Sequence, residues 1–288
     1  MQPVAIVTDS TADIRADAAA RLDIGVVSLA VIYPNGDSVL ETDLTDLAAY
    51  WRSLEDLSAL PTTSQPSVGA FTACYEPLLA AGRDIVSVHL SAAISGTIAA
   101  AELAAETLLE QYPDRKIIVC DSRMAGGGLA LVALAAQAAA ARGDDLDSVA
   151  AITNAAAGKT RIWFAVESLE HLRRGGRIGN AQAWLGTALK IKPILTCDGE
   201  ITPIERVRTS KRAFERLVAY AEELKADGCT AWVVQHIQAA EGAAQLVERA
   251  SEILGTEPVL VAEVGPVIGT HVGPGLLGIG GAPPFAGA

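Results

Sequence analysis

The sequence predicts an α/β protein made of a parallel-sheet α/β/α domain, residues 1–160, followed by an α+β domain, residues 161–288. Up to about residue 160, apolar runs alternate with helical segments at intervals of roughly 30 residues, the pattern of a doubly wound sheet. Beyond it, an Asp198-Gly199 turn between two β-rich runs predicts an antiparallel hairpin. Hydrophobic residues make up 50% of the chain and aromatic residues 5%, so Ala, Leu, Val and Ile supply the core.

Each expected element of the first domain follows from its residue pattern. Apolar runs at residues 4–7, 25–32, 84–90 and 116–120 predict strands, and periodic segments predict helices at 46–57, at 67–81, from 97 and from 128. Small polar residues follow three of these runs, as Thr8-Asp9-Ser10, Ser91 and Asp121-Ser122. Ligands sit at the carboxyl ends of strands in open α/β sheets, so this edge is a candidate site.

The second domain shows a different order of elements. Strands are expected at residues 161–166, 190–196, 201–208, 230–235 and 259–264, and helices at 210–225 and 240–254. Residues 265–275 are dense in glycine and are expected to form a loop. From Gly280 onward we expect a frayed tail.

Composition excludes several classes of function. A net charge of −12 argues against a duplex nucleic-acid partner, which requires a large basic face. The four cysteines form no CxxC pair, which indicates neither a zinc framework nor a disulfide scaffold and favours a reducing, cytoplasmic location. No signal peptide is recognised at the start. The uncharged stretch 124–141 is rich in alanine and glycine and predicts a buried helix, so no stable membrane insertion is expected.

A loop of hydrogen-bond donors lies at residues 61–67, Pro-Thr-Thr-Ser-Gln-Pro-Ser. The two prolines stiffen it, and Ser67 can cap the helix that follows, where free N–H groups favour an anion. The alternative is a capped loop with incidental hydroxyl groups. A second candidate cradle is Ser95-Gly96-Thr97 at a strand-to-helix junction, where glycine allows close approach to the backbone.

The four histidines are too scattered for a metal site. His89, His171 and His236 are expected to be structural, whereas His271 lies among four glycines in residues 265–275 and is a candidate for contact with a ligand or the other domain. Two nucleotide-like patterns fail. The glycines at 273, 275 and 278 have no βαβ unit after them, and Gly158-Lys159-Thr160 follows a helix and lacks the first P-loop glycine.

A small hydrolase is the alternative from another class. Ser95 and His271, with Asp9 as the third member, would form its triad. The sequence contains no GxSxG elbow, and a cradle of donors explains the serine equally well.

These motifs together resemble the DegV family, the bacterial fatty-acid-binding proteins that serve fatty acid kinase. The matching segments are residues 7–13, 63–67, 89–91 with 95–97, 120–122, 169–178, 190–195 and 269–275. They include Thr63-Ser64-Gln65-Pro66-Ser67, Ser95-Gly96-Thr97, Gly175-Gly176-Arg177-Ile178 and Gly269-Thr270-His271. They follow the family order along nearly the whole chain.

The resemblance implies two domains with a ligand tunnel between or beside them, enclosing one long-chain fatty acid. By motif match, Thr63 and Ser95 would hydrogen-bond the carboxylate, with Ser64 and the Gly96 amide as neighbours. His271 would complete the cradle from the second domain. The rest of the tunnel would be apolar, because each buried methylene contributes about 0.8 kcal/mol.

The resemblance also implies a carrier without catalytic residues, cofactor or metal. The bound acid would be phosphorylated by the ATP-binding subunit of a fatty acid kinase, with Arg177 and Arg206 as partner-facing residues. Contact with a membrane would be transient at most. Ala92-Ala93 and Ile98-Ala99 are smaller or more apolar than the residues common beside the Ser-Gly-Thr step in the family, and they leave the tunnel width and the acyl preference open. Another acidic amphiphile, such as an isoprenoid acid, is an alternative ligand.

Overall fold

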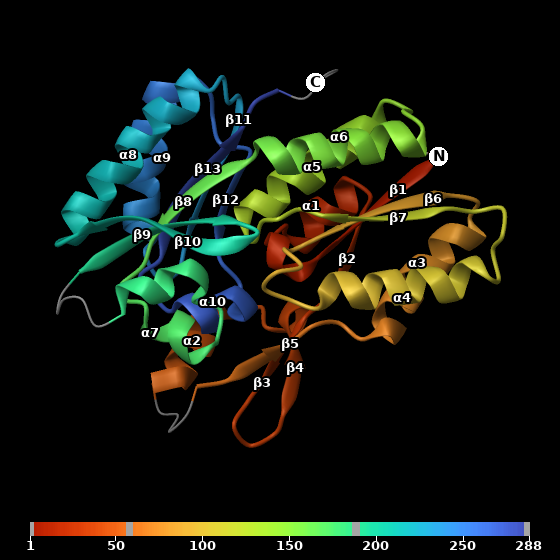
Figure 1. Ribbon diagram of the computed structural model, residues 1–288, viewed down its shortest axis with the longest axis horizontal. Coiled ribbons are helices and arrows are strands. Elements are labelled where there is room, and N and C mark those ends of the chain that lie inside the picture. The colour runs from red at the N-terminus through yellow and green to blue at the C-terminus, as the bar shows by residue number, and fades with distance from the viewer. Residues whose placement is uncertain (1–2, 56–59, 186–190, 285–288) are drawn as a thin grey trace.

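The computed structural model describes residues 3–55, 60–185 and 191–284 (Figure 1). Its first sheet has four parallel strands in the order β2-β1-β6-β7. They are β1 (Val4–Asp9), β2 (Ile24–Val27), β6 (Asp84–His89) and β7 (Ile117–Asp121). The predicted parallel sheet is therefore confirmed.

Helices cover both faces of this sheet because successive side chains of a strand point to opposite sides. Ala5 and Val7 of β1 pack in one cluster with apolar residues of α3 (Val68–Ala80) and α4 (Thr97–Leu109). Ile6 packs on the other side with α5 (Gly127–Ala141) and α6 (Leu146–Lys159). The short helix α1 (Ala16–Arg21) leads into β2. The α/β/α arrangement follows directly.

A small antiparallel sheet, β4-β3-β5, was not predicted. The apolar run 25–32 is divided between two sheets, because β2 ends at Val27 and β3 (Ala30–Ile32) pairs with β4 (Ser38–Leu40). On its other side β3 pairs with β5 (Thr62–Ser64), so the donor loop is partly a strand. The 3₁₀ turns Ser10–Ala12 and Glu41–Asp43 and the helix α2 (Leu47–Glu55) complete this region.

The second sheet is mixed and has six strands in the order β10-β9-β8-β13-β11-β12. Their bounds are β8 (Arg161–Ala165), β9 (Lys192–Asp198), β10 (Glu200–Val207), β11 (Ala231–His236), β12 (Leu260–Glu263) and β13 (Leu277–Ala282). The predicted hairpin is confirmed as the antiparallel pair β9-β10, with its turn at Gly199 (φ +79°). The expected strand residue Lys190 lies outside the described residues.

Helices α8 (Ser210–Ala226) and α9 (Ala240–Leu254) cover one face of the mixed sheet (Figure 1). The other face meets α5, where Leu131 packs against Val233 of β11. α5 thus lies between the two sheets and is apolar nearly all round, which explains the uncharged stretch 124–141. Within the described ranges, no helix has the length and apolar character needed to cross a membrane.

Two expectations for the C-terminal region were wrong. The expected loop at 265–275 contains the helix α10 (Pro266–Val272), with Pro266 in its first turn. The expected frayed tail begins with the last three residues of β13, which lies inside the mixed sheet between β8 and β11. Its glycines permit close approach, because a Cβ on Gly280 would lie 2.9 Å from the carbonyl oxygen of Arg161.

The elements joining β8 to β9 are α7 (Glu170–Arg174) and the 3₁₀ helix Gly179–Trp184. The largest hydrophobic cluster includes Ile6 and Val86 of the parallel sheet together with Phe164 and Leu195 of the mixed sheet. The two halves therefore share core contacts, and the division at residues 160 and 161 stays a prediction.

Candidate functional site

A cavity of about 350 Å³ lies between the carboxyl edge of the parallel sheet and the mixed sheet. Leu29, Leu90 and Ala125 reach it from segments that follow β2, β6 and β7, the edge at which the polar strand ends predicted a site. Its volume falls in the range of small-molecule sites, roughly 300–1,000 Å³.

The five predicted binding residues meet at the polar end of this cavity. Thr63, Ser64, Ser95, Gly96 and His271 all line it. Three separate elements bring them together: β5, the loop between β6 and α4, and α10. The three hydroxyl-bearing residues are half-buried and Gly96 is exposed, so the polar end reaches the surface.

Thr63 is fixed by backbone pairing and by one side-chain contact. It lies opposite Val31 in the β3-β5 pair, and its Oγ1 is 2.7 Å from Nε2 of His271. This contact joins residues 208 positions apart in the chain. Of the two contacts expected for His271, with a ligand or with the other domain, this one reaches a residue of the segment 1–160.

The Ser95-Gly96-Thr97 step forms the second side of the polar end. Ser95 Oγ lies 2.8 Å from Thr97 Oγ1 and accepts a hydrogen bond from the Thr97 amide at 3.3 Å. A Cβ on Gly96 would meet the side-chain amide of Gln65, an exposed and flexible side chain that would have to move aside. Gln65 also lines the cavity and was not predicted as a site residue, although it belongs to the donor loop.

His271 is neutral at physiological pH. Burial, and then the positive charge of Arg177, lower the pKa of His271 to about 4. Its Nδ1 is buried and has no hydrogen-bond partner among the described residues.

Apart from Gln235 and Cys197, the side chains that line the remainder of the cavity are apolar. They come from β8, α7, β10 and the segments around α10, namely Ile162, Phe164, Leu172, Ile201, Val264, Val267, Ile268, Val272 and Leu276. Hydrogen-bond donors at one end and aliphatic walls elsewhere match an amphiphile with an anionic head group.

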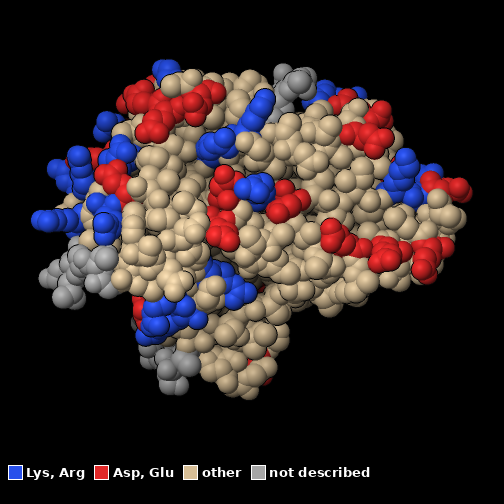
Figure 2. Space-filling model, in the orientation of Figure 1, with Lys and Arg blue, Asp and Glu red and all other residues tan. Residues whose placement is uncertain are grey.

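The two predicted partner-facing arginines have different surroundings. Arg177 is exposed and also lines the cavity, and it donates to the carbonyl oxygens of Ile94 at 3.3 Å and Gly175 at 2.8 Å. Arg206 does not line the cavity, and its guanidinium lies 5.0 Å from the centre of the Trp184 ring. Basic side chains gather near α7 and α10 in Figure 2. Contact with a partner stays a prediction for both.

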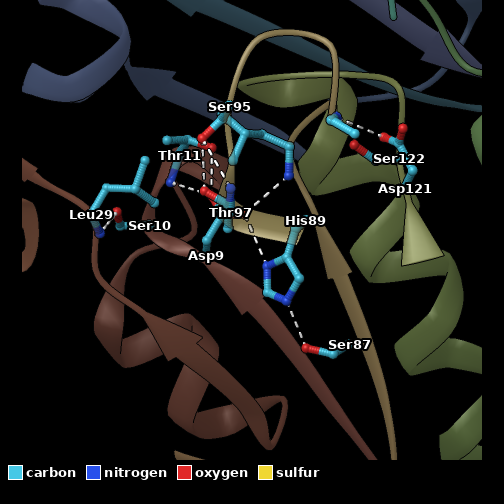
Figure 3. A network of polar contacts seen from close by, with 12 residues as sticks. Asp9, Ser10, Thr11, Leu29, Ser87, His89, Ser95, Thr97, Asp121 and Ser122 are labelled. Carbon is cyan, nitrogen blue, oxygen red and sulfur yellow. Dashed lines mark hydrogen bonds and ion pairs between the residues drawn. The ribbon is translucent and has the colours of Figure 1, made fainter. Parts of the chain in front are cut away.

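The structure does not bring Ser95, His271 and Asp9 together as the hydrolase alternative requires. Asp9 accepts from the Leu90 amide and from Thr11 and contacts His89 Nδ1 at 3.1 Å, as Figure 3 shows. Among the described residues, no hydrogen bond joins Ser95 to His271. His89 is fully buried and its Nε2 lies 2.6 Å from Ser87 Oγ, which confirms the structural role expected for this histidine.

Two carboxyl groups, the buried Glu41 and the half-buried Asp13, hold the helix that carries His271. Asp13 accepts from the Gly265 amide at 2.8 Å, and Glu41 accepts from the Val267 amide at 2.7 Å. Burial raises the pKa of both carboxyl groups, and for Asp13 the charge of Glu41 adds to the effect. Sequence reasoning missed both residues, because their partner amides lie 252 and 226 positions away.

The next question is whether side chains elsewhere in the described residues could bind a metal ion. Within the described ranges, no group of three or more His, Cys, Asp or Glu side chains is placed to hold a metal ion. All four cysteines are free thiols.

Comparison with known proteins identifies the family. The DegV family model, described as an uncharacterised protein of that family, matches residues 3–283. The chain belongs to the DegV family. A DegV domain-containing protein of Clostridium perfringens is 37% identical over 278 residues, which cover 96% of this chain and 97% of the relative.

Solved DegV structures share the fold. A fatty-acid-binding DegV family protein from Thermus thermophilus superposes with a TM-score of 0.86 at 33% identity, covering 98% of this chain and all of that one. A stearic-acid-binding protein from Eubacterium ventriosum superposes with a TM-score of 0.89 at 25% identity, covering 96% and 97% of the two chains. Fatty acid binding thus occurs in this family.

Proposed function

We propose that this protein binds one long-chain fatty acid in the cavity and presents its carboxylate to a fatty acid kinase. The carboxylate would lie among Thr63, Ser64, Ser95 and the Gly96 amide, with His271 supporting Thr63. The acyl chain would occupy the apolar remainder. The observation that carries the proposal is the cavity's division into a donor end and an aliphatic end, in a family with fatty-acid-binding members.

The energetics favour this orientation of the ligand. A carboxylate removed from water loses its hydration, and charge-assisted hydrogen bonds from hydroxyl and amide groups offset that loss. The exposed Arg177 adds a positive charge at the same end. Each methylene that leaves water contributes about 0.8 kcal/mol, so the chain supplies most of the affinity and the head group fixes the direction.

The kinase step belongs to a separate partner. In this proposal the protein is a carrier and not an enzyme, located in the cytoplasm, and the ATP-binding subunit of the kinase forms the acyl phosphate. The polar end of the cavity reaches the surface, which would expose the carboxylate to a partner. The arginines at 177 and 206 would contact that partner.

Native mass spectrometry of gently purified protein tests ligand binding. One co-bound molecule with the mass of a long-chain fatty acid is expected, and extraction would give its length and number of double bonds. A protein that is stripped of lipid and then refuses stearate would refute the proposal. A different acidic amphiphile in the extract would keep the cavity assignment and change the ligand.

Tests of chemical reactivity distinguish the hydrolase alternative from the carrier proposal. If Ser95 were a nucleophile, a fluorophosphonate would label it covalently and the protein would turn over an ester substrate. The carrier proposal predicts neither reaction.

A further inference from the structure

Two histidines and two glycines form a reciprocal contact between α7 and α10. His271 of α10 packs on Gly175, the residue that ends α7, and a Cβ on Gly175 would collide with His271 Nδ1. His171 of α7 packs on Gly273, the residue that ends α10, where a Cβ would lie 2.6 Å from the ring. Each helix end thus provides a side-chain-free surface for the imidazole of the other.

This contact determines what faces Nδ1 of His271. The hydrogen on the Gly175 Cα that a side chain would replace points at this nitrogen. A Cα–H group is a weak donor and cannot accept a hydrogen bond. Arg177 keeps the glycine in place by donating to its carbonyl oxygen at 2.8 Å.

A neutral imidazole carries its proton on one nitrogen and a lone pair on the other. A proton on Nδ1 would be a buried donor without an acceptor, which is unfavourable in a folded protein. A proton on Nε2 would instead be donated to Thr63 Oγ1, 2.7 Å away. Low pKa and geometry agree here, since His271 titrates at about 4 and stays neutral above that pH.

The position of this proton controls the hydroxyl group of Thr63, which has one hydrogen to donate. If Nε2 were the acceptor, the hydroxyl group of Thr63 would donate its only hydrogen to the imidazole. If Nε2 is the donor, the hydroxyl hydrogen is free for the cavity that Thr63 lines.

We propose that Gly175 is a positioning residue that holds His271 as the Nε2-protonated tautomer, so that Thr63 offers its hydroxyl hydrogen to the ligand. The proposal rests on the proposed function for the identity of that ligand, a carboxylate. The tautomer itself is a property of the protein without ligand. With His271 in this tautomer, the hydroxyl group of Thr63 can donate a hydrogen bond to the ligand, which suits a ligand that is an anion.

Nitrogen-15 NMR of the lipid-stripped protein at neutral pH tests the tautomer directly. The signals of His271 are assigned by comparison with His271→Gln. We expect a protonated, pyrrole-type Nε2 and an unprotonated, pyridine-type Nδ1. A proton on Nδ1, or an even mixture of tautomers, would overturn the proposal whether or not the protein binds fatty acid.

Gly175→Ala tests the positioning role. Gly175 has φ −74° and ψ −9°, a conformation that alanine adopts freely, so the main effect of the substitution is the collision with the imidazole, beside a tight 3.2 Å approach to the His171 carbonyl oxygen. We expect weaker stearate binding by about tenfold or more, as for loss of one charge-assisted hydrogen bond, together with a changed His271 signal. The control is Gly158→Ala in α6, where a Cβ meets no atom within 4 Å and binding should be unchanged.

The outcomes separate this inference from the proposed function. Stearate binding and an unchanged His271 signal in Gly175→Ala would refute the positioning role and leave the function standing. The expected tautomer in a protein that refuses stearate would refute the function and leave the tautomer assignment standing. If Gly175→Ala does not fold, the spectrum of the unsubstituted protein decides the proposal.

Discussion

Replacing Glu41 by glutamine should make the stability of the protein less dependent on pH. The Glu41 side chain is 7% exposed and accepts hydrogen bonds from the Val267 amide at 2.7 Å and from Ser10 Oγ at 2.5 Å. Burial raises its pKa from 4.5 to about 7, and the charge of Asp9 adds to the effect, while the two hydrogen bonds oppose it.

The magnitude follows from linkage between proton binding and folding. The difference between 4.5 and about 7 corresponds to about 3 kcal/mol of stability. Because the folded state holds the proton more tightly, this stability is fully present below pH 4.5 and is lost as the pH rises through about 7. Glutamine is uncharged at every pH and can still accept from the Val267 amide, so the variant avoids this loss.

Denaturant unfolding of both proteins at several pH values between 5 and 8 measures the effect. The stability of Glu41→Gln relative to the unsubstituted protein should rise by about 2–3 kcal/mol across this range. The exposed Glu102→Gln in α4 serves as the control, and its relative stability should not follow this trend. A constant difference for Glu41→Gln would refute the reasoning, because Glu41 would then be ionised throughout the range.

Four further predictions concern the site and the fold. Thr63→Val with Ser95→Ala should weaken stearate binding in calorimetry by about 1–3 kcal/mol per hydrogen bond lost, and unchanged affinity would place the carboxylate elsewhere. Arg206→Gln should slow phosphorylation by the kinase at unchanged lipid affinity, so a loss of lipid binding would contradict its placement outside the cavity. Stearate affinity should show no step near pH 6.5, where an ordinary histidine titrates, because the pKa of His271 is about 4. Ile279→Ala should cost about 2–5 kcal/mol in chemical unfolding because this β13 residue is fully buried, and a cost near zero would contradict the packing of β13 inside the sheet.

Local patterns predicted the elements whose residues obey local rules. Residues close together in the sequence determine three such features: the alternation of strands and helices, the Asp198-Gly199 hairpin and the Ser67 cap of α3. The C-terminal region was misread because glycine density indicates a loop when only neighbours in sequence are considered. In β13 the glycines instead allow close packing against the neighbouring strand β8, since a Cβ on Gly278 would lie 3.0 Å from Phe164 Cβ.

The candidate site shows the same limit. The donor residues of the cradle lie in short motifs, and all five line the cavity. The carboxyl groups of Asp13 and Glu41 support the cradle through amides more than two hundred residues away, and no spacing rule connects such positions. The contact of His271 with Gly175 is equally nonlocal. The sequence showed a histidine among glycines, but the glycine that matters belongs to another segment.

The cavity draws its walls from the small and mixed sheets, from α10 and from segments that follow strands of the parallel sheet, and the Thr63–His271 hydrogen bond joins β5 to α10. Breaking this hydrogen bond and moving β5 away from α10 would widen the polar end of the cavity, through which a long chain could leave. Its residence time would then follow the rate of this opening, and its release would accelerate steeply with temperature, as local unfolding does. Such a protein would keep its cargo through dilution and purification and exchange it slowly with free lipid.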